Sequence, residues 1–437
     1  AFRKYSPGSI FSGAGLSAFF DGDHEQVAIA GLNSSVFQEL LELISPGLSL
    51  TSGELGKMPF LTSSENPGLS KLSSDLICAA STDWNAYERS WDFQSLPLLT
   101  ASTEPTPTLE SSYTAWITQN RDTIAEMKRL EEENNRLFID AYGLADELTP
   151  DVPIEQITLT VNPAYRYGGK LTEEEQWTRF RQDTMEELVS YAIGCMMGRY
   201  SLDAPGLIYA HSGNEGFDAL LSEGQYTTFP ADDDGIVPLT DTEWFDDDAC
   251  NRLVEFISLA WRAEDLETNL NFLADNLSPK RGESSRDTLR RYLSNSFYKD
   301  HMQTYKKRPI YWLFSSGKEK AFQCLVYLHR YNQGTLARMR TEYVIPLTAK
   351  LNAHIQKLEN DKTAIDATSE IKVLEKRIAQ LHKQQLELNH FDEKLRHYAD
   401  QRITLDLDDG VKVNYAKFGD LLVDVKAITG NKPEVIA

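Results

Sequence analysis

The spacing of apolar residues between positions 349 and 401 constrains the fold of this chain more than any other feature. Leu and Ile recur there mostly in steps of three and four residues, at Leu351, Ile355, Leu358, Ile371, Leu374, Ile378, Leu381, Leu388 and Leu395. This period places apolar side chains on one face of a helix. Residues 346–402 are therefore predicted to form a coiled coil or a helical hairpin, with a turn between Asn360 and Thr368.

Helical spacing dominates the rest of the chain as well. The predicted helices cover residues 26–44, 69–80, 109–145, 172–198, 241–277 (two helices, the first capped by Thr240 or Asp241), 284–304 and a region from Thr335 that is interrupted at Pro346. Short β-branched or aromatic runs predict strands at 157–161 and 309–314. Residues 54–61 are predicted to be extended, 320–329 to be a strand or a short helix, and 403–413 to be a hairpin. The predicted fold class is α+β, mainly helical, with a small mixed α/β portion.

A Ser/Thr/Pro-rich stretch at residues 100–108 separates two compositionally different parts. Such composition is typical of a linker. The chain is therefore predicted to have six consecutive parts. They are a first region (1–100), a linker (101–112), a long spacer helix (113–150), a helical domain (151–345), the coiled coil or hairpin (346–402) and a hairpin and tail (403–437).

Charge is distributed very unevenly along the chain. The formal net charge is −22, but residues 280–340 hold 14 Lys and Arg against four acids, which gives 14 − 4 = +10. A protein this acidic is repelled by nucleic acid over long distances. Two explanations of the basic window remain open. Its arginines could pair with the acidic residues 231–248 inside the fold, or they could contact phosphates, which releases counterions and strengthens binding at low salt.

The four cysteines, at positions 78, 195, 250 and 324, are far apart and contain no C-x-x-C pair. A disulfide framework or zinc site is not predicted, and a reducing cytoplasm fits best. No apolar run approaches the roughly 18 residues that span a bilayer, so no membrane partner is expected. The first residues include neither an initiator Met nor a secretory apolar core, as expected for a piece of a longer chain.

Two short motifs imitate a methyltransferase site. Residues 11–15 match F-x-G-x-G, a loop that approaches S-adenosylmethionine, and residues 162–165 are one residue from N-P-P-Y, which holds a flipped adenine. However, no buried strand precedes Phe11, and Ala164 replaces the second proline. Residues 315–318 end like a phosphate-binding loop but lack its first glycine, so a turn is predicted. The histidines have no metal-binding spacing, and acidic loops are usually solvated. No catalytic, cofactor or metal residue is predicted in this chain.

Several longer strings resemble a known family. They are residues 83–93, 198–203, 307–317, 325–331 and 407–415, spread over nearly the whole chain. These strings are similar to the carboxy-terminal half of the PglX family, the adenine-specific DNA methyltransferases of BREX phage-defence systems, which are related to type IIG restriction-modification enzymes. In that family the methyltransferase domain comes first, target recognition second and a helical region last. The resemblance implies that segments 5–15, 32–37 and 53–59 belong to target recognition and that the catalytic motifs would lie before Ala1.

The resemblance implies a fragment that positions duplex DNA for methylation of adenine N6 by a catalytic domain elsewhere. S-adenosylmethionine would serve the full-length enzyme and would not bind this chain. The candidate DNA-binding residues are Arg3, Lys4, Ser12 and Gly13 near the glycine turn and Lys306, Lys307, Arg308, Arg338 and Arg340 in the basic window. Expected partners are double-stranded DNA and other BREX proteins, and a basic face could also attract acidic phage proteins that mimic DNA.

Two rival hypotheses remain. In the first, the helical hairpin and acidic surface bind other defence proteins and DNA is not contacted. In the second, the chain is a complete enzyme that uses Phe11–Gly15 and Asn162–Tyr165.

Overall fold

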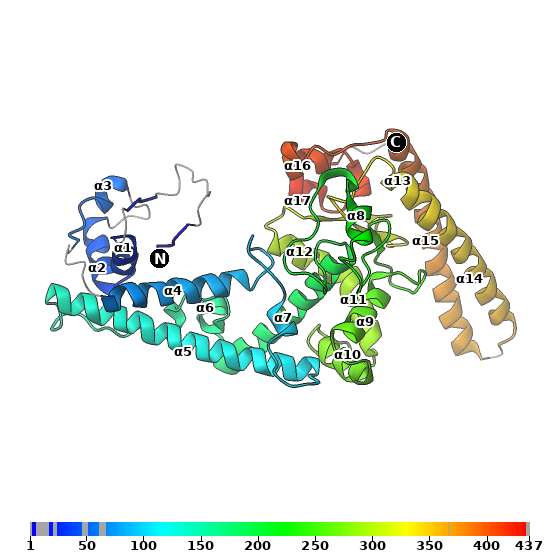
Figure 1. The fold of residues 1–437 in the computed structure, drawn as a ribbon. Helices are drawn as coiled ribbons and strands as arrows, with labels where there is room; N and C mark the ends of the chain where they lie inside the picture. The colour runs from blue at the N-terminus through cyan, green and yellow to red at the C-terminus, as the bar shows by residue number, and fades with distance from the viewer. Residues whose placement is uncertain are drawn as a thin grey trace. The chain divides into compact units, whose positions relative to one another are not determined.

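The computed structural model describes residues 2–5, 17–20, 24–45, 51–60, 67–365 and 367–433. The chain divides into two compact units, one formed by residues 1–90 and 114–180 and the other by residues 91–113 and 181–437 (Figure 1). Each unit is therefore assembled from two separate pieces of chain. The predicted fold class is confirmed, because helices dominate and one small sheet is present in the described residues.

The first unit is helical. It contains α1 (His24–Leu32), α2 (Ser35–Ile44), α3 (Ser52–Leu55), α4 (Pro67–Asn85), most of α5 (Leu109–Tyr142), α6 (Pro163–Tyr167) and the first part of α7 (Glu173–Met196). Its core joins α1, α2, α4 and α5 through the buried residues Ala30, Leu32, Val36, Phe37, Met58, Leu69, Leu72, Leu130, Phe138 and Ile139. The predicted helices 26–44, 69–80, 109–145 and 172–198 are confirmed, the first with a break where Ser34 caps α2.

Two predictions fail in the first unit. Residues 157–161 form no strand, because the Asp83 carboxylate accepts the N–H groups of Thr160 (2.7 Å) and Val161 (2.9 Å) in place of a neighbouring strand. Burial raises the pKa of this carboxyl group. The segment predicted to be extended at 54–61 begins inside α3, which a Thr51–Glu54 capping box nucleates.

A three-stranded antiparallel sheet lies in the second unit, in the order β1 (Ile236–Pro238), β3 (Gln323–Tyr327), β2 (Tyr311–Ser315). The register pairs Leu313 with Leu325, and Val237 also pairs with Leu325 from the other side. Every residue of the three strands is buried, as apolar runs of this kind predict for strands covered on both faces. The predicted strand at 309–314 is confirmed, and the ambiguous segment 320–329 is a strand.

The second unit also contains ten α-helices in the described residues. They are α8 (Phe217–Ser222), α9 (Ala249–Ala260), α10 (Leu266–Asp275), α11 (Ser285–Tyr292), α12 (Tyr298–Thr304), α13 (Thr335–Arg338), α14 (Ile345–Thr363), α15 (Thr368–Asp400), α16 (Gly410–Ala416) and α17 (Val425–Thr429). The N-cap of α9 is Asp248, which accepts the N–H groups of Cys250 and Asn251, so neither Thr240 nor Asp241 has the predicted role.

The predicted interruption of the helix at Pro346 is wrong, because the helix continues through this residue. A π-helical segment, Met339–Val344, leads directly from α13 into α14, and Pro346 lies in the first turn that follows. Proline lacks an N–H group and crowds the preceding turn, and a wider π turn accommodates this within a continuous helix.

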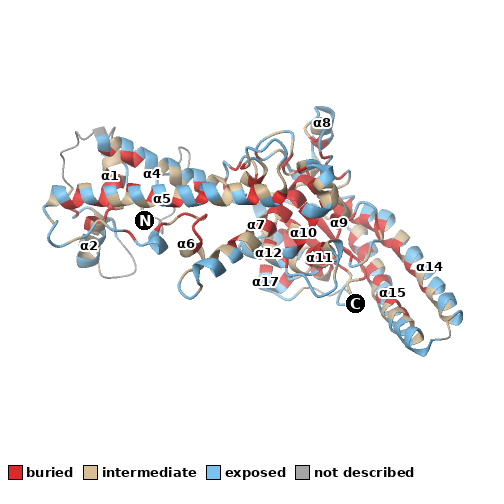
Figure 2. Ribbon diagram, turned by 90° about the horizontal axis from the view of Figure 1, so that it is seen from below, coloured by how far each residue is buried: buried red, intermediate tan, exposed pale blue. Residues whose placement is uncertain are grey.

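Of the two alternatives for residues 346–402, the structure contains the helical hairpin. Helices α14 and α15 lie side by side and are joined at residues 364–367 (Figure 1). Each helix alternates buried and exposed positions along its length (Figure 2), and the buried side chains include Leu351, Ile355, Leu381 and Leu388. These are residues whose spacing predicted the element.

The predicted hairpin at 403–413 is wrong. Residues 407–409 form a 3₁₀ turn that leads into α16. The helix is favoured because it buries Tyr415, whose hydroxyl donates to the Val423 carbonyl at 2.7 Å and lies 2.8 Å from the Tyr298 hydroxyl. Leu422 forms an isolated bridge to Phe314 of the sheet, where the Val423 N–H donates to the Leu313 carbonyl at 3.1 Å.

Residues 101–112, predicted to be a linker, pack within the second unit. Leu109 is fully buried, and its N–H donates to Asn269 Oδ1 at 2.8 Å. The Trp261 indole donates to Ser112 Oγ at 3.1 Å.

Among the described helices, none alone is long and apolar enough to cross a membrane. Helices α1 and α2, which meet at a bend of 70°, pass that test of length and composition only as a pair.

Candidate nucleic-acid interface

The turn between α12 and β2 holds three consecutive cations, Lys306, Lys307 and Arg308, which we call the cationic turn. Helix α12 ends in a Schellman motif, because the N–H of Lys306 donates to the Gln303 carbonyl (3.1 Å) and that of Lys307 to the Met302 carbonyl (2.8 Å). A further bond from the Arg308 N–H to the Tyr305 carbonyl, at 2.9 Å, closes the turn.

The backbone of the cationic turn is strained. Lys306 and Lys307 have φ values of 49° and 61°, in the left-handed region that glycine or asparagine usually occupies. A left-handed conformation costs a residue with a β-carbon roughly 1 kcal/mol or more. Two successive lysines therefore occupy positions where other residues would be more stable, which points to a role for their charge.

The three side chains of the cationic turn are exposed. Within the described part of the chain, no carboxylate forms an ion pair with any of them, and no side-chain hydrogen bond holds them. Their charge is therefore available to an external anion.

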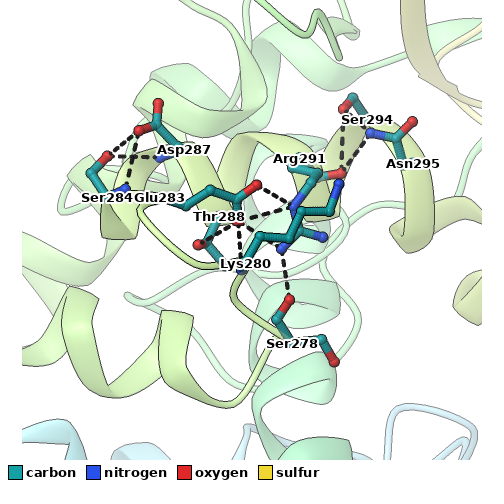
Figure 3. A network of polar contacts seen from close by, with 9 residues as sticks. All are labelled: Ser278, Lys280, Glu283, Ser284, Asp287, Thr288, Arg291, Ser294 and Asn295. Carbon is teal, nitrogen blue, oxygen red and sulfur yellow. Dashed lines mark hydrogen bonds and ion pairs between the residues drawn. The ribbon is translucent and has the colours of Figure 1, made fainter.

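Most other arginines of the basic window have partners inside the fold. Arg290 pairs with Asp248, which is buried, and Arg286 pairs with Glu267 at 2.7 Å. Arg291 binds Glu283 at 2.8 Å in the network of Figure 3, where Ser278, Lys280 and Thr288 complete the hydrogen bonds. Hydrogen bonds from Arg291 lower the pKa of Glu283 to about 2.

The explanation by internal pairing thus holds for part of the window. Of the acidic segment 231–248, Asp248 pairs with Arg290, and the Asp232 and Asp233 carbonyls accept from Arg330. The remaining partners come from elsewhere in the second unit.

The other predicted DNA-binding residues either have an ion-pair or hydrogen-bond partner within their unit or lie outside the described residues. Arg340 is half-buried and pairs with Asp392 at 2.8 Å, and Arg338 lies 3.5 Å from Glu342 on the same helix. In the first unit, Arg3 donates to Thr158 Oγ1 at 3.1 Å and Lys4 pairs with Glu25 at 3.2 Å. Ser12 and Gly13, like residues 11–15 as a whole, lie outside the described residues.

Arg199 lies near the cationic turn, but the sequence did not indicate it as a site residue. The guanidinium of Arg199 lies over the ring of Tyr305, the residue immediately before the turn, at 5.8 Å. Arg199 lies in one of the strings that resembled PglX, but nothing in the local sequence distinguishes it from any other arginine. Its position becomes informative only when the fold places it beside Tyr305.

The residues that imitate an adenine site do not fit that role. Asn162 is buried and is the N-cap of α6, and its amide donates to the carbonyls of Ile154 (2.7 Å) and Ile157 (2.9 Å) while Oδ1 accepts from the Ala164 N–H. Its hydrogen-bonding groups are therefore engaged by the backbone and are not directed to a base.

The segment Ser315–Lys318 is a turn, as predicted. It joins β2 to β3, and the Glu387 carboxylate of α15 accepts from Ser316 Oγ at 2.7 Å and from the N–H groups of Glu319 and Ala321 at 2.6 and 3.2 Å. A carboxylate at this position would repel a phosphate. Within the described ranges, no group of three or more His, Cys, Asp or Glu residues could hold a metal ion.

Comparisons with known proteins find two relatives that are named as adenine-specific methyltransferases. No family model matches the chain. It is 47% identical, over 99% of its own length, to the adenine-specific methyltransferase BrxX of Escherichia coli O9:H4 (strain HS), of which it covers 36%. It is 38% identical, over 95% of its length, to the adenine-specific methyltransferase PglX of Lacticaseibacillus casei (strain Zhang), of which it covers 33%.

The chain thus spans about a third of the length of these curated relatives. The similarity extends over both units and over the cationic turn, of which Lys307 and Arg308 begin one of the strings that first suggested the relationship. The chain is thus PglX-like, similar to one part of two proteins that are named as adenine-specific methyltransferases.

Proposed function

We propose that this chain is the DNA target-recognition and scaffold part of an S-adenosylmethionine-dependent adenine-N6 DNA methyltransferase in BREX phage defence. It positions duplex DNA so that a catalytic domain preceding it in the whole protein can methylate one adenine. The observation that carries the proposal is the cationic turn, three exposed and internally unpaired cations on a strained backbone.

Local geometry is what allows so acidic a chain to bind DNA. With a net charge of −22, the long-range field opposes approach, so binding needs a concentrated local source of cations. Each phosphate neutralised by Lys or Arg releases counterions and contributes affinity that depends on salt but not on base sequence. The cationic turn therefore positions the duplex, and contacts to base edges supply specificity.

Base reading is assigned to the first unit in this proposal. Arg3 and Lys4 are exposed polar side chains close in sequence to Ser12 and Gly13, the other proposed target-recognition residues. Arg338 and Arg340 have a smaller role as phosphate contacts, because their ion pairs with Glu342 and Asp392 would have to open first.

The methyl donor belongs to the whole protein. Because Asn162 is engaged by the backbone, the proposal places the flipped adenine elsewhere in the whole protein, together with S-adenosylmethionine, and gives this chain the positioning of DNA. Other BREX proteins are the proposed assembly partners. Acidic proteins that imitate DNA would compete for the cationic turn by the same electrostatic attraction.

The test is the salt dependence of duplex binding, measured by fluorescence anisotropy. The variant Lys306→Gly/Lys307→Asn/Arg308→Gln removes the three charges with residues that suit the backbone. If the three cations contact three phosphates, the slope of log K against log salt falls by about 2 to 3. Thermal unfolding of both proteins confirms that the fold is retained.

A matched control removes three charges that already have partners. Arg129→Gln/Arg262→Gln/Arg286→Gln changes the net charge equally, but each of these exposed arginines is ion-paired with Glu126, Glu264 or Glu267. Its slope should equal that of the unsubstituted chain. An equal loss in both variants would mean that only overall charge matters. Absence of duplex binding at low salt, with retained binding to a BREX protein, would favour the interaction-module hypothesis.

A further inference from the structure

Arg199 is held in place by the end of helix α7. The N–H of Gly198 donates to the Cys195 carbonyl (3.0 Å) and that of Arg199 to the Gly194 carbonyl (2.9 Å), which forms a second Schellman motif. Gly198 has a φ of 73°, and a β-carbon there would lie 2.5 Å from the Phe217 ring. The backbone of Arg199 is therefore fixed by both hydrogen bonds and close packing.

Aromatic and histidine rings surround the guanidinium. It lies 5.1 Å from the ring centre of Tyr200 and 5.8 Å from that of Tyr305. His301 packs against Tyr305, at 4.7 Å between ring centres, and stacks on Tyr311 at 4.9 Å. Burial, and to a smaller extent the charge of Arg199, lowers the pKa of His301 to about 3 and that of His329 to about 4. Both rings are neutral near pH 7.

Arg199 and His301 each have a buried hydrogen-bond donor without an acceptor in the described structure. Arg199 Nε is buried and makes no hydrogen bond, and no described carboxylate pairs with the guanidinium. His301 Nε2 accepts from the N–H groups of Ile310 (3.1 Å) and Tyr311 (3.2 Å), so the ring proton of the neutral form lies on Nδ1. His301 Nδ1 is likewise buried without an acceptor.

Arg330 of the same unit is also an arginine inside the fold, but its guanidinium has hydrogen-bond acceptors. Arg330 lies 3.7 Å over the ring of Phe217, and its three nitrogens donate to Asn214 Oδ1, the Asp232 carbonyl and the Asp233 carbonyl. Buried polar groups nearly always have partners, and a buried cation without one is costly. The fold therefore satisfies Arg330 and leaves Arg199 requiring an acceptor.

We propose that Arg199 forms an oxyanion-binding site that takes a phosphate group. Its Nε–H, which has no acceptor in the described structure, suits an oxygen of a phosphate, and guanidinium–phosphate hydrogen bonds are among the strongest that proteins make. Arg199 as a whole is only partly buried, so part of its side chain is accessible to solvent. Since Lys306 follows Tyr305 directly, the site continues the cationic turn inward.

The source of the phosphate rests on the proposed function. If duplex DNA lies on the cationic turn, the site at Arg199 receives one of its backbone phosphates. If it does not, the same chemistry would recognise a free phosphate or the phosphate of a small molecule. The two sources are separated by using inorganic phosphate and duplex DNA as independent probes.

The experiment follows thermal unfolding of the full chain in inorganic phosphate and in chloride of equal ionic strength. Phosphate should raise the Tm in a saturable way beyond the effect of chloride. Arg199→Met should bind phosphate about tenfold more weakly or worse, while its Tm without phosphate is unchanged or higher, because an uncompensated cation has been removed. Arg199→Lys keeps the charge but loses the planar fork, and should bind with intermediate affinity.

A second variant separates this site from the cationic turn. Lys306→Gly/Lys307→Asn/Arg308→Gln should keep the response to inorganic phosphate while it loses duplex affinity. A phosphate response with no duplex binding in any protein would leave the Arg199 site standing and would end the DNA proposal. A phosphate response that is absent, or equal in Arg199→Met and the unsubstituted chain, would overturn the site. So would marked destabilisation of both Arg199 variants, because Arg199 would then be structural.

Discussion

Helices α7 and α12 end in the same backbone motif but with different residues at its left-handed position. The end of α7 has Gly198, whereas the end of α12 has Lys306. In both motifs the next residue is a cation, Arg199 in one and Lys307 in the other. The hydrogen-bond pattern is thus common to both, but the end of α12 has lysines at two successive left-handed positions, 306 and 307, whereas the end of α7 has only Gly198 in that conformation.

The difference shows which residue is explained by backbone conformation and packing and which is not. At Gly198 the ring of Phe217 leaves no room for a side chain, so glycine meets both the steric and the backbone requirement. Lys306 is exposed and faces no such restriction, yet it occupies a conformation that opposes it. A residue retained against its backbone preference at a solvent-exposed position points to function at the side chain.

The largest expected effect comes from placing a side chain at the end of α7. Gly198→Ala should destabilise the second unit by about 2 to 4 kcal/mol, because it adds left-handed strain and a clash with Phe217. Gly282→Ala is the control, since Gly282 also has a positive φ but no atom within 4 Å of the added β-carbon. Urea unfolding should show a smaller loss of unfolding free energy for Gly282→Ala. Equal losses in the two variants would mean that the clash with Phe217 does not contribute.

The next effect concerns His301, which lies in the last turn of α12. A helix C-terminus favours a charged histidine, but burial dominates and lowers its pKa to about 3. Below the ordinary pKa of 6.5, the unfolded chain binds a proton that the folded chain does not. Stability is therefore complete above that pH and declines as the pH falls toward about 3, by at most about 1.4 kcal/mol per pH unit from this residue.

Urea unfolding from about pH 7 to about pH 5 measures this decline. His301→Gln keeps a side-chain acceptor for the N–H groups of Ile310 and Tyr311, and its stability should depend less steeply on pH. His329 contributes in the same direction, so a residual slope is expected. A slope identical to that of the unsubstituted chain would mean that His301 is not buried in its neutral form.

The smallest effect is a gain in stability at the cationic turn. Lys306→Gly should stabilise the second unit by about 1 kcal/mol or less, because relief of the left-handed strain exceeds the entropy that glycine gives the unfolded chain. Lys306→Ala removes the same charge without relieving the backbone and should show no gain. If the two variants have equal unfolding free energies, the comparison between the two helix ends no longer supports a functional Lys306.

The elements that the sequence predicted well are those with a long, regular pattern. Apolar spacing identified α5, α7 and the α14–α15 hairpin, and an aromatic run identified β2. Short patterns failed where a single side chain outweighed them. Asp83 satisfies the backbone that would have been a strand at 157–161, and the burial of Tyr415 converts the expected hairpin into α16.

The candidate site was predictable only in part for a related reason. The charges of Lys306, Lys307 and Arg308 are visible in the sequence, and their position beside β2 follows from the apolar run after Pro309. Which arginines of the window are neutralised depends on partners as distant as Asp392 for Arg340. Arg199 lies about a hundred residues before the turn it approaches, so no local pattern could have indicated it.

The two-piece construction of the second unit has a consequence for biosynthesis. The N–H of Leu109 donates to Asn269, which lies 160 residues later in the chain, so this hydrogen bond forms only after Asn269 has been synthesised. All residues of the first unit, in contrast, have been translated once position 180 is reached. Translation therefore supplies the first unit complete while 91–113 still lack their packing partners. An expression boundary placed within 101–112 would separate Ser112 from the residues before it and remove Ala101 from the core it helps to fill.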